Sequence, residues 1–99
     1  MVSSAIQEGN YITTLDKNSG HQNSFHAQGL LFGYSDEIIC TQADSYINVY
    51  DSNGNHMCNF HVGGGKGQTV IDKTINVREE NYLVTYDERG TKLRDKYVG

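Results

Sequence analysis

The fold is decided by the stretch Tyr46-Ile47-Asn48-Val49-Tyr50-Asp51-Ser52-Asn53-Gly54, because related stretches begin at Tyr11 and Tyr82. These tyrosines lie 35 residues before and 36 residues after Tyr46, and an aspartate follows each of them five positions later. Similarity at a fixed period is the signature of a repeat architecture. Residues 1–99 are therefore predicted to be a single domain with three repeats, at approximately residues 4–35, 36–72 and 73–99.

Each repeat has the pattern of a β-hairpin. Residues 46–50 are rich in β-branched and aromatic side chains, which favour strands. Asp51 and Gly54 then supply a turn, because Asp bonds to nearby backbone and Gly tolerates a left-handed conformation. Return strands are predicted at residues 22–27, 57–62 and 93–98, and further strands at residues 4–7, 30–34, 37–42, 68–71 and 73–78. The chain is thus predicted to be all-β, with about eleven short antiparallel strands and a last repeat that lacks its linking strand.

The repeated segment resembles the blades of bacterial β-propellers and YD-type repeats, in which a strand ends in Tyr-Asp and a glycine follows, as in Tyr50-Asp51-Ser52-Asn53-Gly54. The resemblance implies blade-like units of four antiparallel strands. Alternation of side chains alone also allows a β-sandwich, a twisted meander or a small β-trefoil, so these folds stay open as alternatives.

Three blade-like units are too few for a closed propeller, which usually has four to eight blades. An open stack would expose unpaired strand edges, and such edges invite pairing with another chain. Twofold dimers are the commonest symmetric assembly. We therefore expect a homo-oligomer, and a homodimer in particular.

Composition and charge exclude several classes of function. The chain has 8 Lys and Arg against 12 Asp and Glu, a formal net charge of −4, which argues against a nucleic-acid partner. It has no apolar run long enough for a membrane span. The start of the chain has no secretion-signal pattern, so we expect a cytoplasmic protein in which Cys40 and Cys58 are reduced, with a disulfide between them as the alternative.

The best candidate ligand-binding residues are polar or aromatic and occupy repeated positions. The tyrosines that open the repeated strand come first, because rings on a half-exposed face suit sugars or peptides; the alternative is that they pack between units. The full candidate set is Tyr11, Tyr46, Tyr82, His26, His61 and Asn48. No metal or other cofactor is expected, since the repeated histidines have no evident third and fourth ligand.

Catalysis is not expected. His56 and Cys58 are two residues apart, so simple alternation places them on one face, but no cleft is evident and the third repeat has Lys92 and Arg94 in their places. The glycine-rich residues 63–69 lack the Gly-Lys-Ser/Thr order of a phosphate loop and are predicted to be a linker. The sequence favours a self-associating binding module for a glycan or a protein, with a purely assembling accessory protein as the alternative.

Overall fold

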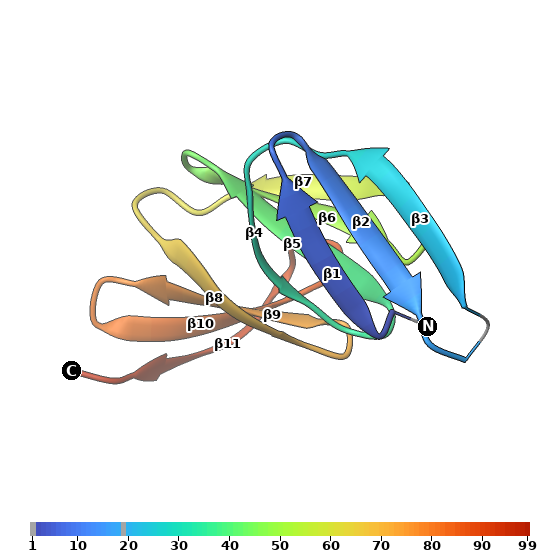
Figure 1. The fold of residues 1–99 in the computed structure, drawn as a ribbon. Helices are drawn as coiled ribbons and strands as arrows, with labels where there is room; N and C mark the ends of the chain where they lie inside the picture. The colour runs from blue at the N-terminus through green and yellow to red at the C-terminus, as the bar shows by residue number, and fades with distance from the viewer. Residues whose placement is uncertain (1, 19) are drawn as a thin grey trace.

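The computed structural model describes residues 2–18 and 20–99, except for the side chain of residue 21. These residues form eleven β-strands and no helix, which confirms the predicted all-β fold (Figure 1). The strands are β1 (Ser4–Glu8), β2 (Tyr11–Asp16), β3 (His21–His26), β4 (Leu30–Tyr34), β5 (Ile38–Ala43), β6 (Tyr46–Asp51), β7 (His56–His61), β8 (Lys66–Ile71), β9 (Thr74–Glu79), β10 (Tyr82–Asp87) and β11 (Lys92–Tyr97).

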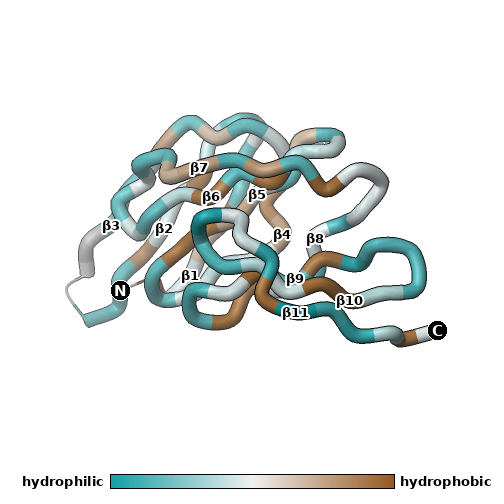
Figure 2. Tube along the Cα trace, turned by 180° about the vertical axis from the view of Figure 1, so that it is seen from behind, coloured by the Kyte–Doolittle hydropathy of each residue, from teal (hydrophilic) through white to brown (hydrophobic). Residues whose placement is uncertain are grey.

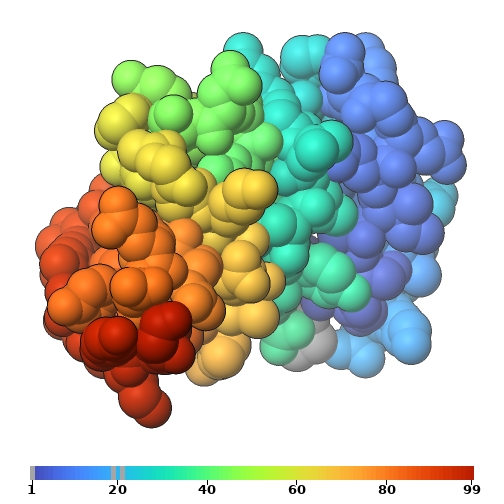
Figure 3. Space-filling model, turned by 90° about the vertical axis from the view of Figure 1, so that its left-hand side faces the viewer, coloured from blue at the N-terminus to red at the C-terminus, as the bar shows by residue number. Residues whose placement is uncertain are grey.

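The strands make three separate antiparallel sheets. The first sheet has the order β1-β2-β3, the second β4-β5-β6-β7 and the third β8-β9-β10-β11. The sheets follow one another along the molecule, from the N-terminal sheet at one end to the C-terminal sheet at the other (Figure 3). Three open, meandering sheets agree with the blade-like prediction and differ from the two sheets of a sandwich or the closed barrel of a trefoil.

The linking strands belong to the repeat that follows them. β4 pairs with β5 and β8 pairs with β9, so the second sheet covers residues 30–61 and the third covers residues 66–97. The prediction that the last repeat lacks a strand was therefore wrong, because the three-stranded sheet is the first. A tight turn decides the pairing: the backbone N–H of Ser35 donates to the carbonyl of Ile38 over 2.8 Å, which folds β4 directly onto β5.

The repeated aspartate closes each hairpin turn. The Asp51 Oδ1 atom accepts hydrogen bonds of 2.9 Å from the backbone N–H groups of Asn53 and Asn55. In the third sheet Asp87 Oδ1 accepts two bonds of the same length, from the turn that follows it. Desolvation pushes the pKa of Asp51 up, but the bonds from Asn55 and Asn53 outweigh it, so this pKa lies below its usual value. The repeated Tyr-x-x-x-x-Asp pattern thus encodes a strand and its turn.

A β-bulge follows the turn in the second sheet. Val49 pairs with Cys58, whereas Tyr50 pairs with His56, so Met57 is an extra residue in β7. The third sheet has the same bulge, at Leu93 in β11. Because an extra residue interrupts the alternation of side chains, residues on either side of the bulge point to opposite faces of the sheet.

The hydrophobic core lies in two layers between the sheets. The first layer joins the first and second sheets and contains the buried residues Val2, Ile12, Ala27, Ile39 and Tyr50. The second layer joins the second and third sheets and contains Ile38, Cys40, Ile47, Val49, Val62, Ile75 and Val77. The second sheet is thus covered on both faces, and the hydrophobic residues of β5 stand out in Figure 2.

Glutamine side chains clamp each sheet to the next one. The Gln7 amide donates to the carbonyl of Gly29 over 2.7 Å and accepts from the N–H of Leu31 over 2.8 Å. Gln42 makes the same pair of bonds, over the same distances, to Gly65 and Gly67 of the third sheet. Both clamps reach the start of the next sheet's first strand, which fixes the offset between neighbouring sheets.

Candidate functional site

Each predicted tyrosine lies opposite a second ring on the neighbouring strand. The ring centroids are 5.6 Å apart for Tyr11 and His26, 5.1 Å for Tyr46 and His61, and 5.5 Å for Tyr82 and Tyr97. The tyrosines are 57%, 48% and 46% exposed, so they are not packed between the sheets. The structure therefore brings a predicted tyrosine and a predicted histidine together in the first and second sheets, whereas in the third sheet Tyr97 takes the place of the histidine.

A polar pocket of about 220 Å³ lies between the first and second sheets. It is lined by His26, Gln28, Asn48, Tyr50, His56 and Asn59. Two of the predicted residues, His26 and Asn48, thus meet here from different sheets. Among the described residues, no Asp, Glu, Lys or Arg side chain lines this pocket.

Hydrogen bonds and ring contacts hold the pocket wall in place. The Nε2 atom of His56 lies 3.3 Å from Oδ1 of Asn48, and the His56 ring meets the edge of Tyr50 at a centroid distance of 5.3 Å. The Tyr50 hydroxyl accepts a 3.1 Å bond from the backbone N–H of Gln28. The hydroxyl of Thr41 donates to the Gln28 carbonyl over 2.5 Å. The pocket is therefore preformed by groups that bind one another across the two sheets.

One face of β6 and β7 presents three cross-strand pairs in order. These pairs are Tyr46 with His61, Asn48 with Asn59, and Tyr50 with His56. Successive pairs on one face of a strand are about 6.8 Å apart, since each residue rises about 3.4 Å. An amide pair thus stands between two pairs of rings, and the pocket opens onto this arrangement.

The corresponding junction between the second and third sheets has different chemistry. In the register of the repeat, Val84, Lys92 and Asp95 take the places of Asn48, His56 and Asn59. Lys92 Nζ forms an ion pair of 3.0 Å with Asp95 Oδ2. The exposed ring pairs therefore repeat in all three sheets, whereas the polar pocket does not repeat at this junction.

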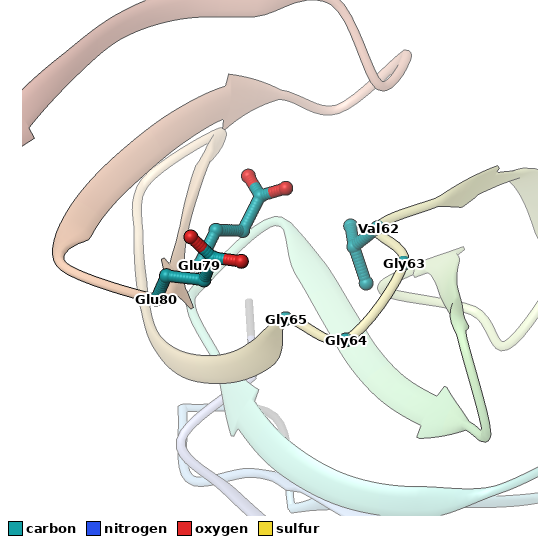
Figure 4. Close-up of a pocket in the computed structure, with 6 residues that line it drawn as sticks. All are labelled: Val62, Gly63, Gly64, Gly65, Glu79 and Glu80. Atoms are coloured by element: carbon teal, nitrogen blue, oxygen red, sulfur yellow. The ribbon is translucent and has the colours of Figure 1, made fainter.

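A second hollow, of about 370 Å³, lies beside the glycine-rich turn between β7 and β8 (Figure 4). Its lining consists of residues 62–65, together with Glu79 and Glu80, which lie across the hollow from the turn. Burial and the 2.6 Å bond that Tyr86 donates to Glu79 raise the pKa of the Tyr86 hydroxyl. Two carboxylates repel a phosphate group, and a strand rather than a helix follows the glycines, so the chemistry of the turn does not suit a phosphate loop.

The expectation that His56 and Cys58 share a face was wrong. The bulge at Met57 turns His56 toward the polar pocket and Cys58 toward the third sheet, where its thiol donates to the carbonyl of Glu88 over 2.9 Å. Burial and the charges of Asp87 and Glu88 raise the pKa of the Cys58 thiol. Burial and the charge of Cys58 raise the pKa of Cys40. Both cysteines are free, so the disulfide alternative is wrong and neither thiol is activated.

Four residues of the polar pocket, Gln28, Tyr50, His56 and Asn59, are absent from the sequence-based set. Asn59 had a usable signal, because a hairpin through the Asp51 turn, once its bulge is allowed for, pairs it with Asn48. No sequence signal pointed to Gln28, because its position at the pocket depends on how the first sheet stacks on the second. Within the described part of the chain, no group of three or more His, Cys, Asp or Glu side chains converges on a metal site.

No protein-family model matches the chain, and no curated protein is similar to it at a significant level. Among residues 2–18 and 20–99, no helix has the length and apolar character needed to cross a membrane. The geometry of the sheets and of the polar pocket is therefore the basis for an argument about function.

Proposed function

We propose that the protein is a small lectin-like module that binds a neutral sugar residue in the polar pocket between its first and second sheets. The observation that carries this proposal is the amide pair Asn48 and Asn59, which stands between two pairs of aromatic rings beside the pocket. Propeller-like blades would present such a pocket where neighbouring sheets meet.

The side chains around the pocket match the chemistry of a sugar ring. Amide and imidazole groups both donate and accept hydrogen bonds, which suits adjacent hydroxyl groups. The exposed rings of Tyr46 and His61 offer flat apolar surface for the C–H face of a sugar. Because no charged side chain of the described chain lines the pocket, a neutral ligand fits better than an anion or a cation.

The size of the pocket favours a single ring. Its volume of about 220 Å³ lies below the roughly 300–1,000 Å³ of pockets for drug-sized molecules. Longer glycans would extend from it along the exposed ring pairs of the neighbouring strands. One ring in the pocket and weak contacts outside it imply modest affinity for the sugar.

A glycan array followed by calorimetry with the free monosaccharides tests this proposal. Asn59→Ala removes one amide at an exposed position and is expected to weaken sugar binding at least tenfold. Asp95→Ala changes the equivalent position of the third sheet and should leave binding unchanged. An array with no neutral glycan bound, or equal losses in the two variants, would exclude the sugar site; a peptide ligand that is lost only in Asn59→Ala would keep the pocket and change the ligand class.

Self-association without a small-molecule site is the second candidate function, and one observation favours it. The first sheet has three strands, so among the described residues no strand takes the place beside β1 that β4 and β8 hold beside β5 and β9. Ile6 of β1 is 61% exposed there. A strand from a second copy would complete this sheet, and light scattering would then give twice the chain mass of 11.1 kDa. A single species of 11.1 kDa at micromolar concentration would exclude the dimer.

A further inference from the structure

The outer face of the third sheet, which points away from the second sheet, carries a row of cations. Cross-strand pairing places Lys66 beside Arg78, Arg78 beside Leu83, and Leu83 beside Lys96. Directly paired residues of a sheet point to the same face. The row therefore carries a cation on β8, β9 and β11 and Leu83 on β10, and it spans roughly 14 Å at about 4.8 Å per strand.

The next row on the same face is polar. Asn76 donates a 3.0 Å bond to the hydroxyl of Thr69 and accepts a 2.7 Å bond from the hydroxyl of Thr85. Arg94 pairs with Thr85 and ends this row on β11. The hydrogen-bonded ladder gives a flat, hydrophilic base, from which the four cations Lys66, Arg78, Arg94 and Lys96 project.

The equivalent face of the second sheet, which packs against the third sheet, carries different residues. At equivalent positions it carries Gln42, Ile47 and Phe60 in one row and Cys40, Val49 and Cys58 in the other, and these residues pack against the third sheet. In the third sheet the clamping glutamine becomes Arg78 and the packing phenylalanine becomes Lys96. The outer face therefore lacks the groups that join one sheet to the next within this chain.

Positive charge is concentrated on this face, although the chain as a whole is negatively charged. The four cations are half of the 8 Lys and Arg in a chain of net charge −4. All four are exposed, and within the described residues none forms an ion pair. The acid on this face, Asp87, is occupied by the two backbone N–H groups of its turn. The face thus presents uncompensated positive charge.

We infer that the outer face of the third sheet docks an acidic polysaccharide. Single exposed ion pairs contribute about 0–1 kcal/mol, so a flat cationic face needs a ligand with many charges. A folded protein partner, including a second copy, is disfavoured because the described residues of this face include no aromatic side chain, and its apolar side chains, Leu83 and the 59% exposed Ile71, lie two strands apart. Single-stranded nucleic acid is disfavoured because the described residues of this face offer no ring for base stacking.

Binding to polygalacturonate, compared with the neutral polymer dextran, tests this inference by affinity electrophoresis. The wild-type protein should be retarded by polygalacturonate alone, and the retardation should fall steeply as salt is added. The double variant Arg94→Glu/Lys96→Glu should bind at least tenfold more weakly. The control Lys17→Glu/Lys73→Glu has the same net charge but changes cations outside this face, and it should bind like the wild type.

Three results would overturn the inference. The first is a wild-type protein that polygalacturonate does not retard at low salt. The second is an equal loss in the two double variants, because overall charge would then explain the retention. The third is tighter binding to single- or double-stranded DNA than to polygalacturonate, lost in Arg94→Glu/Lys96→Glu, which would assign the face to nucleic acid. The neutral-sugar site is tested separately, since Asn59→Ala lies on another face and should not change this binding.

Discussion

The ring of Phe25 packs over Gly54, in the turn of the next sheet, so closely that a Cβ added to Gly54 would lie 2.5 Å from the Cδ1 atom of that ring. Phe60 packs over Gly90 of the third sheet in the same way. Each phenylalanine also contacts a repeated tyrosine, at centroid distances of 5.2 Å for Phe25 and Tyr50 and 4.8 Å for Phe60 and Tyr86. The glycine that closes each of these hairpin turns thus also contacts a phenylalanine of the previous sheet.

Gly54→Ala should lower the free energy of unfolding by about 1–3 kcal/mol. Two causes add: the backbone φ of +89° is unfavourable for alanine, and the new Cβ would push against Phe25. Gly64→Ala is the matched control, since a Cβ there meets nothing within 4 Å and its φ is not in the left-handed region. Urea unfolding measures both, and equal stability of the two variants would contradict the packing.

Gln42→Ala should cost about 1–3 kcal/mol of unfolding free energy, because it leaves the Gly65 carbonyl and the Gly67 N–H without their partner. Arg78→Ala is the control at the equivalent position of the third sheet, where the side chain bonds only the Glu80 carbonyl at an exposed site. The unfolding free energy of Arg78→Ala should lie within about 0.5 kcal/mol of the wild-type value. Chemical denaturation compares the two, and a larger loss in Arg78→Ala would show that the clamp does not join the sheets.

The lowered pKa of Asp51 predicts how stability changes in acid. A carboxyl group whose folded-state pKa lies below its unfolded value stabilises the fold above the unfolded pKa, about 3.9 for Asp, and this stabilisation is lost as the pH falls through the folded pKa. Wild-type protein should therefore be more stable than Asp51→Asn at pH 7, and the difference should shrink below pH 4. Urea titrations at pH 7 and pH 2.5 measure the stability difference between the two proteins. The same difference at both pH values would show that the charge of Asp51 does not stabilise the turn.

Native thiols should react slowly with a disulfide reagent such as Ellman's reagent. Burial holds the pKa of both thiols above the usual value, so little thiolate forms at pH 8. Cys40 should be protected until the protein unfolds, because its side chain is fully buried, and Cys58 should react first. Rapid reaction of both thiols in native protein, at the rate found in urea, would contradict the packing of β5 between the other sheets.

Much of the hairpin structure could be predicted from local residues. The turn at Asp51 and Gly54 depends on side-chain hydrogen bonds and on a left-handed residue within a few positions, so the same Asp-x-x-Gly pattern specified it in the second and third repeats. The pairing of β4 with β5 could not be assigned in this way, because a strand between two repeats alternates equally well beside either. The face of His56 was also missed, since a bulge changes the alternation by one residue.

The sequence by itself therefore determined the repeat and the hairpin turns, both of which depend on short-range backbone geometry. Only the tertiary structure decided which residues meet between the sheets. His26 and Gln28 reach Asn48 because the first sheet stacks on the second at the offset that the Gln7 clamp sets. That offset depends on contacts between residues more than 20 positions apart, and local patterns carry no information about such contacts.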